Sequence, residues 1–201
     1  IRQWAKWRHN IRIPLWFPQM RIWGSMFDVK REIAQALTRP LVAATIPAGL
    51  TEPFAAMHIR RGDKTDGYMD SNQQLIIQGD DVDPRTYIDM LMLKSPEIKS
   101  IFVMTDNYRM IEDLKLASPG YSISTLCNPE ELGHYQPAFS SLEPEQKADR
   151  IQRLIAETHS AAASSVFLGG YTSNVARFVR LWHARPDRCF SVDSQKRWLP
   201  V

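Results

Sequence analysis

The sequence predicts an α/β domain built on a doubly wound, parallel, Rossmann-like sheet. Short apolar runs alternate along the chain with longer segments of helical periodicity, and this alternation is typical of strands joined by crossover helices. The composition agrees, since 44% of the 201 residues are hydrophobic and 23% are charged, as in an ordinary globular domain. We therefore expect one domain of this class with an appendage.

The expected strands and helices follow each other in order. The five apolar runs that we expect to form strands are 54–59, 101–104, 121–126, 165–168 and 189–192. The expected helices are 26–37, a helix that begins at Pro84 after the N-cap Asp83, 108–117, 145–163 and 174–182. Residues 65–82 and the segment after 126 are polar or rich in Pro and Ser, and we expect them to be loops.

The N-terminal 23 residues differ from the rest of the chain. Four tryptophans alternate there with basic residues, a pattern that could indicate a nucleic-acid or membrane-surface stripe. We prefer to interpret residues 1–23 as a connector that packs against a missing N-terminal lobe, and residues 24–201 as the Rossmann-like domain. Since the chain begins without Met, we expect it to be a fragment.

Charge, apolar runs and cysteines narrow the class of protein. A net charge of +3 is too small to predict a nucleic-acid binder, but it suits an anionic small ligand. No apolar run reaches the ~20 residues of a membrane span, so membrane attachment would need a segment absent from this chain. Cys127 and Cys189 fit one disulfide or two free thiols equally well.

Cations gather directly after the first expected strand. Ligands of doubly wound sheets bind outside the carboxyl ends of the strands. Arg60, Arg61 and Lys64 lie there, and guanidinium forks match phosphate oxygens, so the segment predicts a diphosphate site. Gly62 would permit a close turn, and Asp63 could hold an arginine in position. A surface ion-pair loop is the alternative, and Arg61-Gly62-Asp63 also matches the integrin tripeptide, which we attribute to chance.

Two further strand ends carry polar groups. Asp106, within Thr105-Asp106-Asn107, could orient Arg60 or Arg61 or bind a sugar hydroxyl, or the tripeptide could simply cap the next helix. After the fourth strand, Gly169-Gly170 precedes Thr172, Ser173 and Asn174 at the start of a helix. Hydroxyls and free amides at a helix N-terminus form an anion site, although a plain Ser/Thr cap would look the same.

Metal binding is not predicted. Asp81-Val82-Asp83 matches an acidic metal pattern, but Asp83 is already explained as a helix N-cap and the tripeptide does not follow a strand. His58, Glu157 and His159 could supply zinc ligands, but they lack a zinc-site spacing.

Three motifs in this order resemble the α1,6-fucosyltransferases and their bacterial nodulation relatives, in the superfamily that includes the protein O-fucosyltransferases. The resemblance covers about residues 20–195 and rests on His58-x-Arg60-Arg61-x-Asp63-Lys64, Thr105-Asp106-Asn107, and Glu157-x-His159 followed by Thr172-Ser173-Asn174-Val175-x-Arg177. It implies the C-terminal lobe of a GT-B-like glycosyltransferase. That enzyme would transfer fucose from GDP-fucose to a glycan or glycoprotein acceptor by an inverting, metal-independent displacement.

The resemblance also implies roles for single residues. Arg60 would bind the β-phosphate, and Lys64 would assist at the diphosphate. His58 and Glu157 would contact the guanine and its ribose region. Ser173, with the backbone around Asn174, would meet the phosphates. Arg61 and Thr172 are also expected among the donor-binding residues. Asp106 would orient the cationic loop.

The sequence departs from the family at the general base. The family has a glutamate four positions after the motif lysine, where this chain has Tyr68. Asp66 or Asp70 could substitute as catalytic bases. Two alternatives therefore stay open, a catalytically inactive module that binds a sugar nucleotide and a transferase with another donor. The family implies the Golgi or secretory lumen for a eukaryotic source and the cytoplasm for a bacterial one.

Overall fold

The computed structural model describes residues 50–69, 73–77 and 81–193. The connector expected at 1–23, the helix expected at 26–37 and the candidate base Asp70 lie outside the described residues.

The described chain forms a five-stranded parallel sheet in the order β5-β4-β1-β6-β7. The strands are β1 (Phe54–Ile59), β4 (Ser100–Thr105), β5 (Ser122–Thr125), β6 (Val166–Gly169) and β7 (Cys189–Ser191). From β1 the chain moves outward through β4 to β5, and then it returns to the other side of β1 as β6 and β7. The predicted doubly wound α/β class is confirmed, and its topological switch point lies between β1 and β6.

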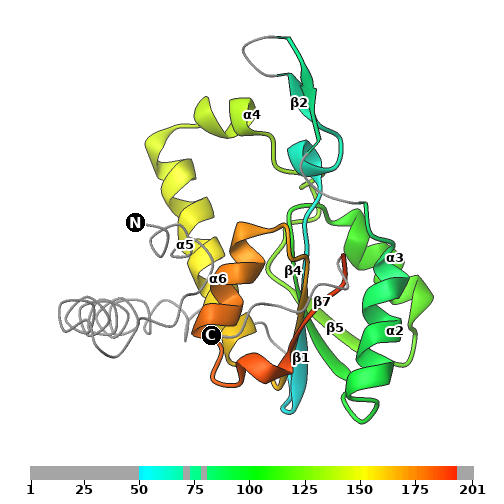
Figure 1. The fold of residues 1–201 in the computed structure, drawn as a ribbon. Helices are drawn as coiled ribbons and strands as arrows, with labels where there is room; N and C mark the ends of the chain where they lie inside the picture. The colour runs from blue at the N-terminus through cyan, green and yellow to red at the C-terminus, as the bar shows by residue number, and fades with distance from the viewer. Residues whose placement is uncertain (1–49, 70–72, 78–80, 194–201) are drawn as a thin grey trace, which may run out of the picture.

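Helices cover both faces of the sheet (Figure 1). One face carries α2 (Pro84–Lys94) and α3 (Arg109–Ala117), and the other carries α5 (Pro144–Ala162) and α6 (Asn174–Trp182). Because side chains of a strand alternate between faces, β1 sends Met57 into the first core and Ala56 into the second. This central strand is buried along its whole length, which explains its uninterrupted apolar run.

The expected caps are present. The Asp83 carboxylate accepts a hydrogen bond of 2.8 Å from the Arg85 amide, and Pro84 occupies the first position of α2. The Ser173 hydroxyl accepts from the Ala176 amide at the start of α6. These two helices begin at the residues predicted for them.

Two expected loops contain short elements. Residues 65–82 include a hairpin of two-residue strands, β2 (Tyr68–Met69) and β3 (Leu75–Ile76), which projects from the body in Figure 1. The second loop contains α4 (Gln136–Ser140). Strands of two residues are too short to show a period-2 pattern, so the sequence could not indicate this hairpin.

Two short 3-10 helices adjoin strands of the sheet. The 3-10 helices are η2 (Gly62–Lys64) after β1 and η3 (Pro186–Arg188) before β7. Cys127 and Cys189 are both buried and both free, so the free-thiol alternative applies. Among the described residues, no helix has the length and apolar content needed to cross a membrane.

Candidate functional site

A cavity of about 600 Å³ opens at the carboxyl ends of β1, β4 and β6, beside the switch point. Every residue that the sequence indicated for donor binding lines it, namely His58, Arg60, Arg61, Lys64, Asp106, Glu157, Thr172, Ser173 and Asn174. The fold therefore brings together groups that are separated by more than a hundred positions in the sequence. Whether they bind a donor stays a prediction.

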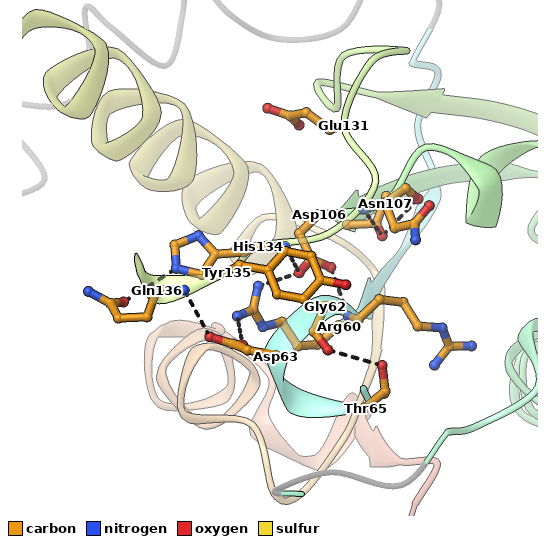
Figure 2. Close-up of polar contacts among 12 residues, drawn as sticks. Arg60, Gly62, Asp63, Thr65, Asp106, Asn107, Glu131, His134, Tyr135 and Gln136 are labelled. Atoms are coloured by element: carbon orange, nitrogen blue, oxygen red, sulfur yellow. Dashed lines mark hydrogen bonds and ion pairs between the residues drawn. The ribbon is translucent and has the colours of Figure 1, made fainter. Parts of the chain in front are cut away.

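Arg60 is held by two carboxylates. Its Nη1 pairs with Asp106 Oδ2, and its Nη2 lies 2.7 Å from Asp63 Oδ1, as Figure 2 shows. A guanidinium carries five N–H donors, so this arrangement fixes the group and leaves donors for a ligand. The expected orienting roles of Asp63 and Asp106 are thus present in the structure.

Asp106 joins three segments at one carboxylate. Besides Arg60, it accepts hydrogen bonds from the Arg61 amide at 2.8 Å and from the His134 amide at 2.9 Å. The N-cap of α3 is Tyr108, and the preceding Asn107 accepts from the Arg109 amide at 3.1 Å. Asn107 therefore contacts the first amide of the helix, whereas Asp106 orients Arg60.

The loop around His134 packs directly on the turn that carries Arg60. The Asp63 amide donates to the His134 carbonyl at 3.0 Å, and the Gln136 amide donates to Asp63 Oδ2 at 3.3 Å. Gly62 has φ +65°, and a Cβ there would lie 2.5 Å from the His134 backbone nitrogen and oxygen. Only glycine fits this contact, so Gly62 sets the position of the turn.

Arg61 points to another part of the chain. Its Nη1 lies 2.9 Å from the Asp81 carboxylate, and its Nη2 donates to the Val82 carbonyl at 2.7 Å. These contacts tie the end of β1 to the segment that returns from the β2–β3 hairpin. The expected contact of Arg61 with a diphosphate stays a prediction, but its charge is already paired.

The acidic tripeptide considered for metal binding is also engaged. Asp81 pairs with Arg61, and Asp83 caps α2. Within residues 50–69, 73–77 and 81–193, no group of three or more His, Cys, Asp or Glu side chains is arranged to hold a metal ion.

His58 and Glu157 contribute buried polar atoms without partners. Neither His58 Nδ1 nor Glu157 Oε1 has a hydrogen-bond partner among the described residues, and both side chains line the cavity. A buried, unpaired polar group costs about 1–3 kcal/mol. Such groups at a cavity wall are typical of ligand sites, where the ligand supplies the missing partner.

Burial keeps both groups neutral. It lowers the pKa of His58 to about 4, with the Arg60 charge acting in the same direction and the Asp106 charge opposing it. Burial raises the pKa of Glu157 to about 8, against the pull of the Arg153 charge. Arg153 is committed elsewhere, because its guanidinium lies 2.7 Å from Glu131 but 4.0 Å from Glu157.

The start of α6 also lines the cavity. Asn174 and Val175 line it, and their amides are in the first turn, where α-helical amides have no partner within the helix. The Thr172 hydroxyl instead donates to Asp193 at 2.8 Å. The wall therefore offers backbone donors from the helix itself.

Asp66 lies at the rim. The Tyr135 hydroxyl donates to Asp66 Oδ2, and Thr65 Oγ1 donates to Asp66 Oδ1 at 3.2 Å. Thr65 and Lys64 line the cavity, whereas Asp66 is exposed and outside the lining. Its role as a general base stays a prediction.

Several site residues had no signal in the sequence. Glu131, His134 and Tyr135 lie in a loop that showed only turn-forming residues, and Asp193 follows the last strand without a motif. Their positions depend on contacts between distant segments, which periodicity and local motifs do not report.

Comparison with known proteins gives limited similarity. No protein-family model and no curated protein matches the sequence. Among solved structures, POFUT1 in complex with GDP matches at 16% identity and a TM-score of 0.46, over 78% of this chain and 45% of that one. POFUT1 in complex with GDP-fucose matches at 16% identity and a TM-score of 0.45, over 79% and 45%. This chain thus spans less than half of the POFUT1 chain, and similarity at this level does not show a family.

Because Glu157 is neutral in the fold, we expect the free energy of unfolding to depend on pH. Its pKa is about 8 in the fold and 4.5 as a free group, so the folded chain holds a proton that the unfolded chain releases. Stability from this group is therefore lost as pH rises, by about 1.4 kcal/mol per pH unit. His58 acts oppositely up to its free pKa of 6.5, so the window between pH 6.5 and 8 isolates Glu157.

We expect Glu157→Gln to remove this decline, as measured by urea unfolding at several pH values between 6.5 and 8. Glu112→Gln, at an exposed position of α3, is the matched control and should keep the wild-type slope. Equal slopes in wild type and Glu157→Gln would show that Glu157 is ionised throughout this range.

Proposed function

We propose that this chain binds a nucleoside diphosphate sugar, GDP-fucose in the first place, and forms the donor-binding lobe of an α1,6-fucosyltransferase-like enzyme. The observation that carries the proposal is one cavity that is lined both by a fixed Arg60 guanidinium and by the side chains whose His58 Nδ1 and Glu157 Oε1 lack partners. The sequence motifs support the same assignment. The transfer would be inverting and independent of metal.

His58 Nδ1 and Glu157 Oε1, which lack hydrogen-bond partners, suit the nucleobase of the ligand. Guanine presents adjacent N–H donors on one edge, and a carboxylate can accept two of them. Glu157 would supply that carboxylate by giving up its proton, and neutral His58 can donate or accept beside it. Adenine lacks this pair of donors, so the two residues would favour guanine.

The diphosphate would lie between Arg60 and the first turn of α6. Lys64 also lines this region, and the amides of Asn174 and Val175 add donors with the positive end of the helix dipole. In the reaction, the acceptor oxygen bonds to the sugar C1 while the bond from C1 to the β-phosphate oxygen breaks. GDP leaves with added negative charge, which a fixed guanidinium stabilises most in the transition state.

A catalytically inactive module that binds a sugar nucleotide is the second candidate. The observation that favours it is Tyr68 at the position of the family's glutamate base. Such a module would keep the cavity and bind GDP without transferring the sugar. A transferase with another donor would instead show a different nucleotide preference.

The function is tested by calorimetry with GDP, UDP and ADP, with and without EDTA. We expect GDP to bind roughly ten- to hundredfold more tightly, because each hydrogen bond lost to a charged group is worth about 1.5–3 kcal/mol. EDTA should leave GDP affinity unchanged. Loss of binding in EDTA would contradict the metal-free proposal, and equal affinity for all three nucleotides would contradict the guanine site.

Arg60→Ala should abolish donor use, and Arg60→Lys should not restore it. Arg60 is partly buried, and loss of one partner from a hydrogen-bonded charge pair costs about 2–5 kcal/mol, or roughly 30- to several-thousand-fold in turnover at ~1.4 kcal/mol per decade. Removal of the guanidinium also leaves Asp63 and Asp106 facing the phosphate uncompensated. Lysine keeps one charge but cannot bridge two carboxylates and a phosphate.

The Arg60 variants are compared with Arg185→Ala, because Arg185 is exposed and paired with Asp187 outside the cavity. Thermal unfolding shows whether each variant is folded. If folded Arg60→Ala turned over within threefold of wild type, the phosphate role would be contradicted. Arg60 would then belong to a surface ion-pair loop, whose ion pairs each contribute under ~1 kcal/mol.

Asp66 is proposed as the general base that takes the acceptor proton, with Asp70 as the alternative. A base must be titratable and within reach of the hydroxyl, and Asp66 lies at the rim of the cavity, next to Thr65. We expect Asp66→Asn to reduce turnover of the whole enzyme at least tenfold while GDP affinity stays unchanged. Full turnover in Asp66→Asn, Asp70→Asn and the double variant would exclude both residues.

A further inference from the structure

The Asp193 carboxylate fills the turn between β6 and α6. Its Oδ1 accepts from the Tyr171 amide at 2.6 Å and from the Ser191 hydroxyl at 2.8 Å. Its Oδ2 accepts from the Thr172 amide at 3.2 Å and from the Thr172 hydroxyl at 2.8 Å. The chain thus places its own anion in the turn where the sequence indicated an anion site.

The turn is shaped around this carboxylate. A Cβ on Gly170 would lie 2.9 Å from Asp193 Oδ2, which is closer than a side chain can approach. From the other side, Arg177 Nε donates to the Tyr171 carbonyl at 2.7 Å, and its guanidinium stacks over the Tyr171 ring. The turn is therefore held both by Asp193 and by α6.

The hydrogen bonds of Asp193 limit what the turn can bind. A carboxylate has about four lone-pair sites, and Asp193 already accepts from four donors. The amides of Tyr171 and Thr172 are thereby occupied, and a negative charge stands in front of them. A phosphate oxygen would be repelled from this part of the turn.

We propose that Asp193 is a positioning residue that directs the diphosphate to the first turn of α6. This inference rests on the proposed function. Asp193 accepts the hydrogen bonds of the Tyr171 and Thr172 amides, so the amides of Asn174 and Val175 are left as the backbone donors at the cavity. It also holds the turn that leads into α6, through the amides of Tyr171 and Thr172. Asp193 itself does not contact the phosphates.

The test compares GDP with guanosine, because only GDP carries the phosphates whose site Asp193 positions. In calorimetry on the full chain, we expect Asp193→Ala to weaken GDP at least tenfold and to leave guanosine within twofold of wild type. Gly170→Ala should give the same pattern, because its Cβ would push the carboxylate out of the turn. Asp187→Ala is the control for loss of an exposed carboxylate, and it should change neither affinity.

Other results of this experiment would overturn the inference, and each has a different meaning. Equal weakening of GDP and guanosine would show that Asp193 only supports the fold, and tighter GDP binding would show that it competes with the phosphate. Unchanged affinities in both variants would likewise overturn the inference. If wild type binds neither GDP nor guanosine, the proposed function itself fails; if wild type binds both and the variants do not discriminate, only the role of Asp193 fails.

Discussion

The pairing of Arg60 with Asp63 and Asp106 is the interaction on which the site depends. Asp63 belongs to the same turn as Arg60, but Asp106 follows the neighbouring strand and is 46 positions away in the sequence. Since β1 and β4 are parallel and paired in register, their carboxyl ends meet at one edge, and the two groups come into contact there. The guanidinium is therefore fixed before any ligand arrives, so little side-chain entropy is lost on binding.

The two carboxylates that hold Arg60 also position the surrounding loops. Asp106 binds the His134 amide, and Asp63 binds the backbone on both sides of Tyr135, so the segment after β5 is held against the turn after β1. That segment carries Glu131, which engages Arg153 at 2.7 Å, whereas Arg153 lies 4.0 Å from Glu157. A single network thus fixes Arg60 at the cavity and leaves Glu157 Oε1 without a hydrogen-bond partner among the described residues. Burial of that group is unfavourable in the empty protein, and a ligand that supplies donors would reverse the effect.

Much of the fold could be predicted from the sequence because its signals are local. The buried run of β1 and the capped α6 occur at the residues expected, and the alternation of strands and helices indicated the parallel, doubly wound class. The expected strand ends also supplied part of the cavity lining, including Arg60, Asp106 and Ser173. The β2–β3 hairpin could not be predicted, because two-residue strands carry no periodic pattern.

The features of the site that could not be predicted from the sequence depend on long-range contacts. The sequence gives Arg61 the same chemistry as Arg60, yet the structure pairs it with Asp81, and only the tertiary fold separates these two arginines. The turn at Gly170 was expected to bind an anion, but no local pattern could show that Asp193, 23 positions later, would supply it. Similarly, the close approach of Gly62 to His134 involves two turns that look unrelated in the sequence.

A crystal structure of the chain with GDP would test the central claim most directly. We expect the guanine edge within hydrogen-bond distance of Glu157 and His58, and the β-phosphate in contact with both Arg60 and the amides at the start of α6. Arg60 should keep its bonds to Asp63 and Asp106 in that complex. A GDP molecule bound outside this cavity, or a diphosphate that contacts neither Arg60 nor α6, would contradict the account.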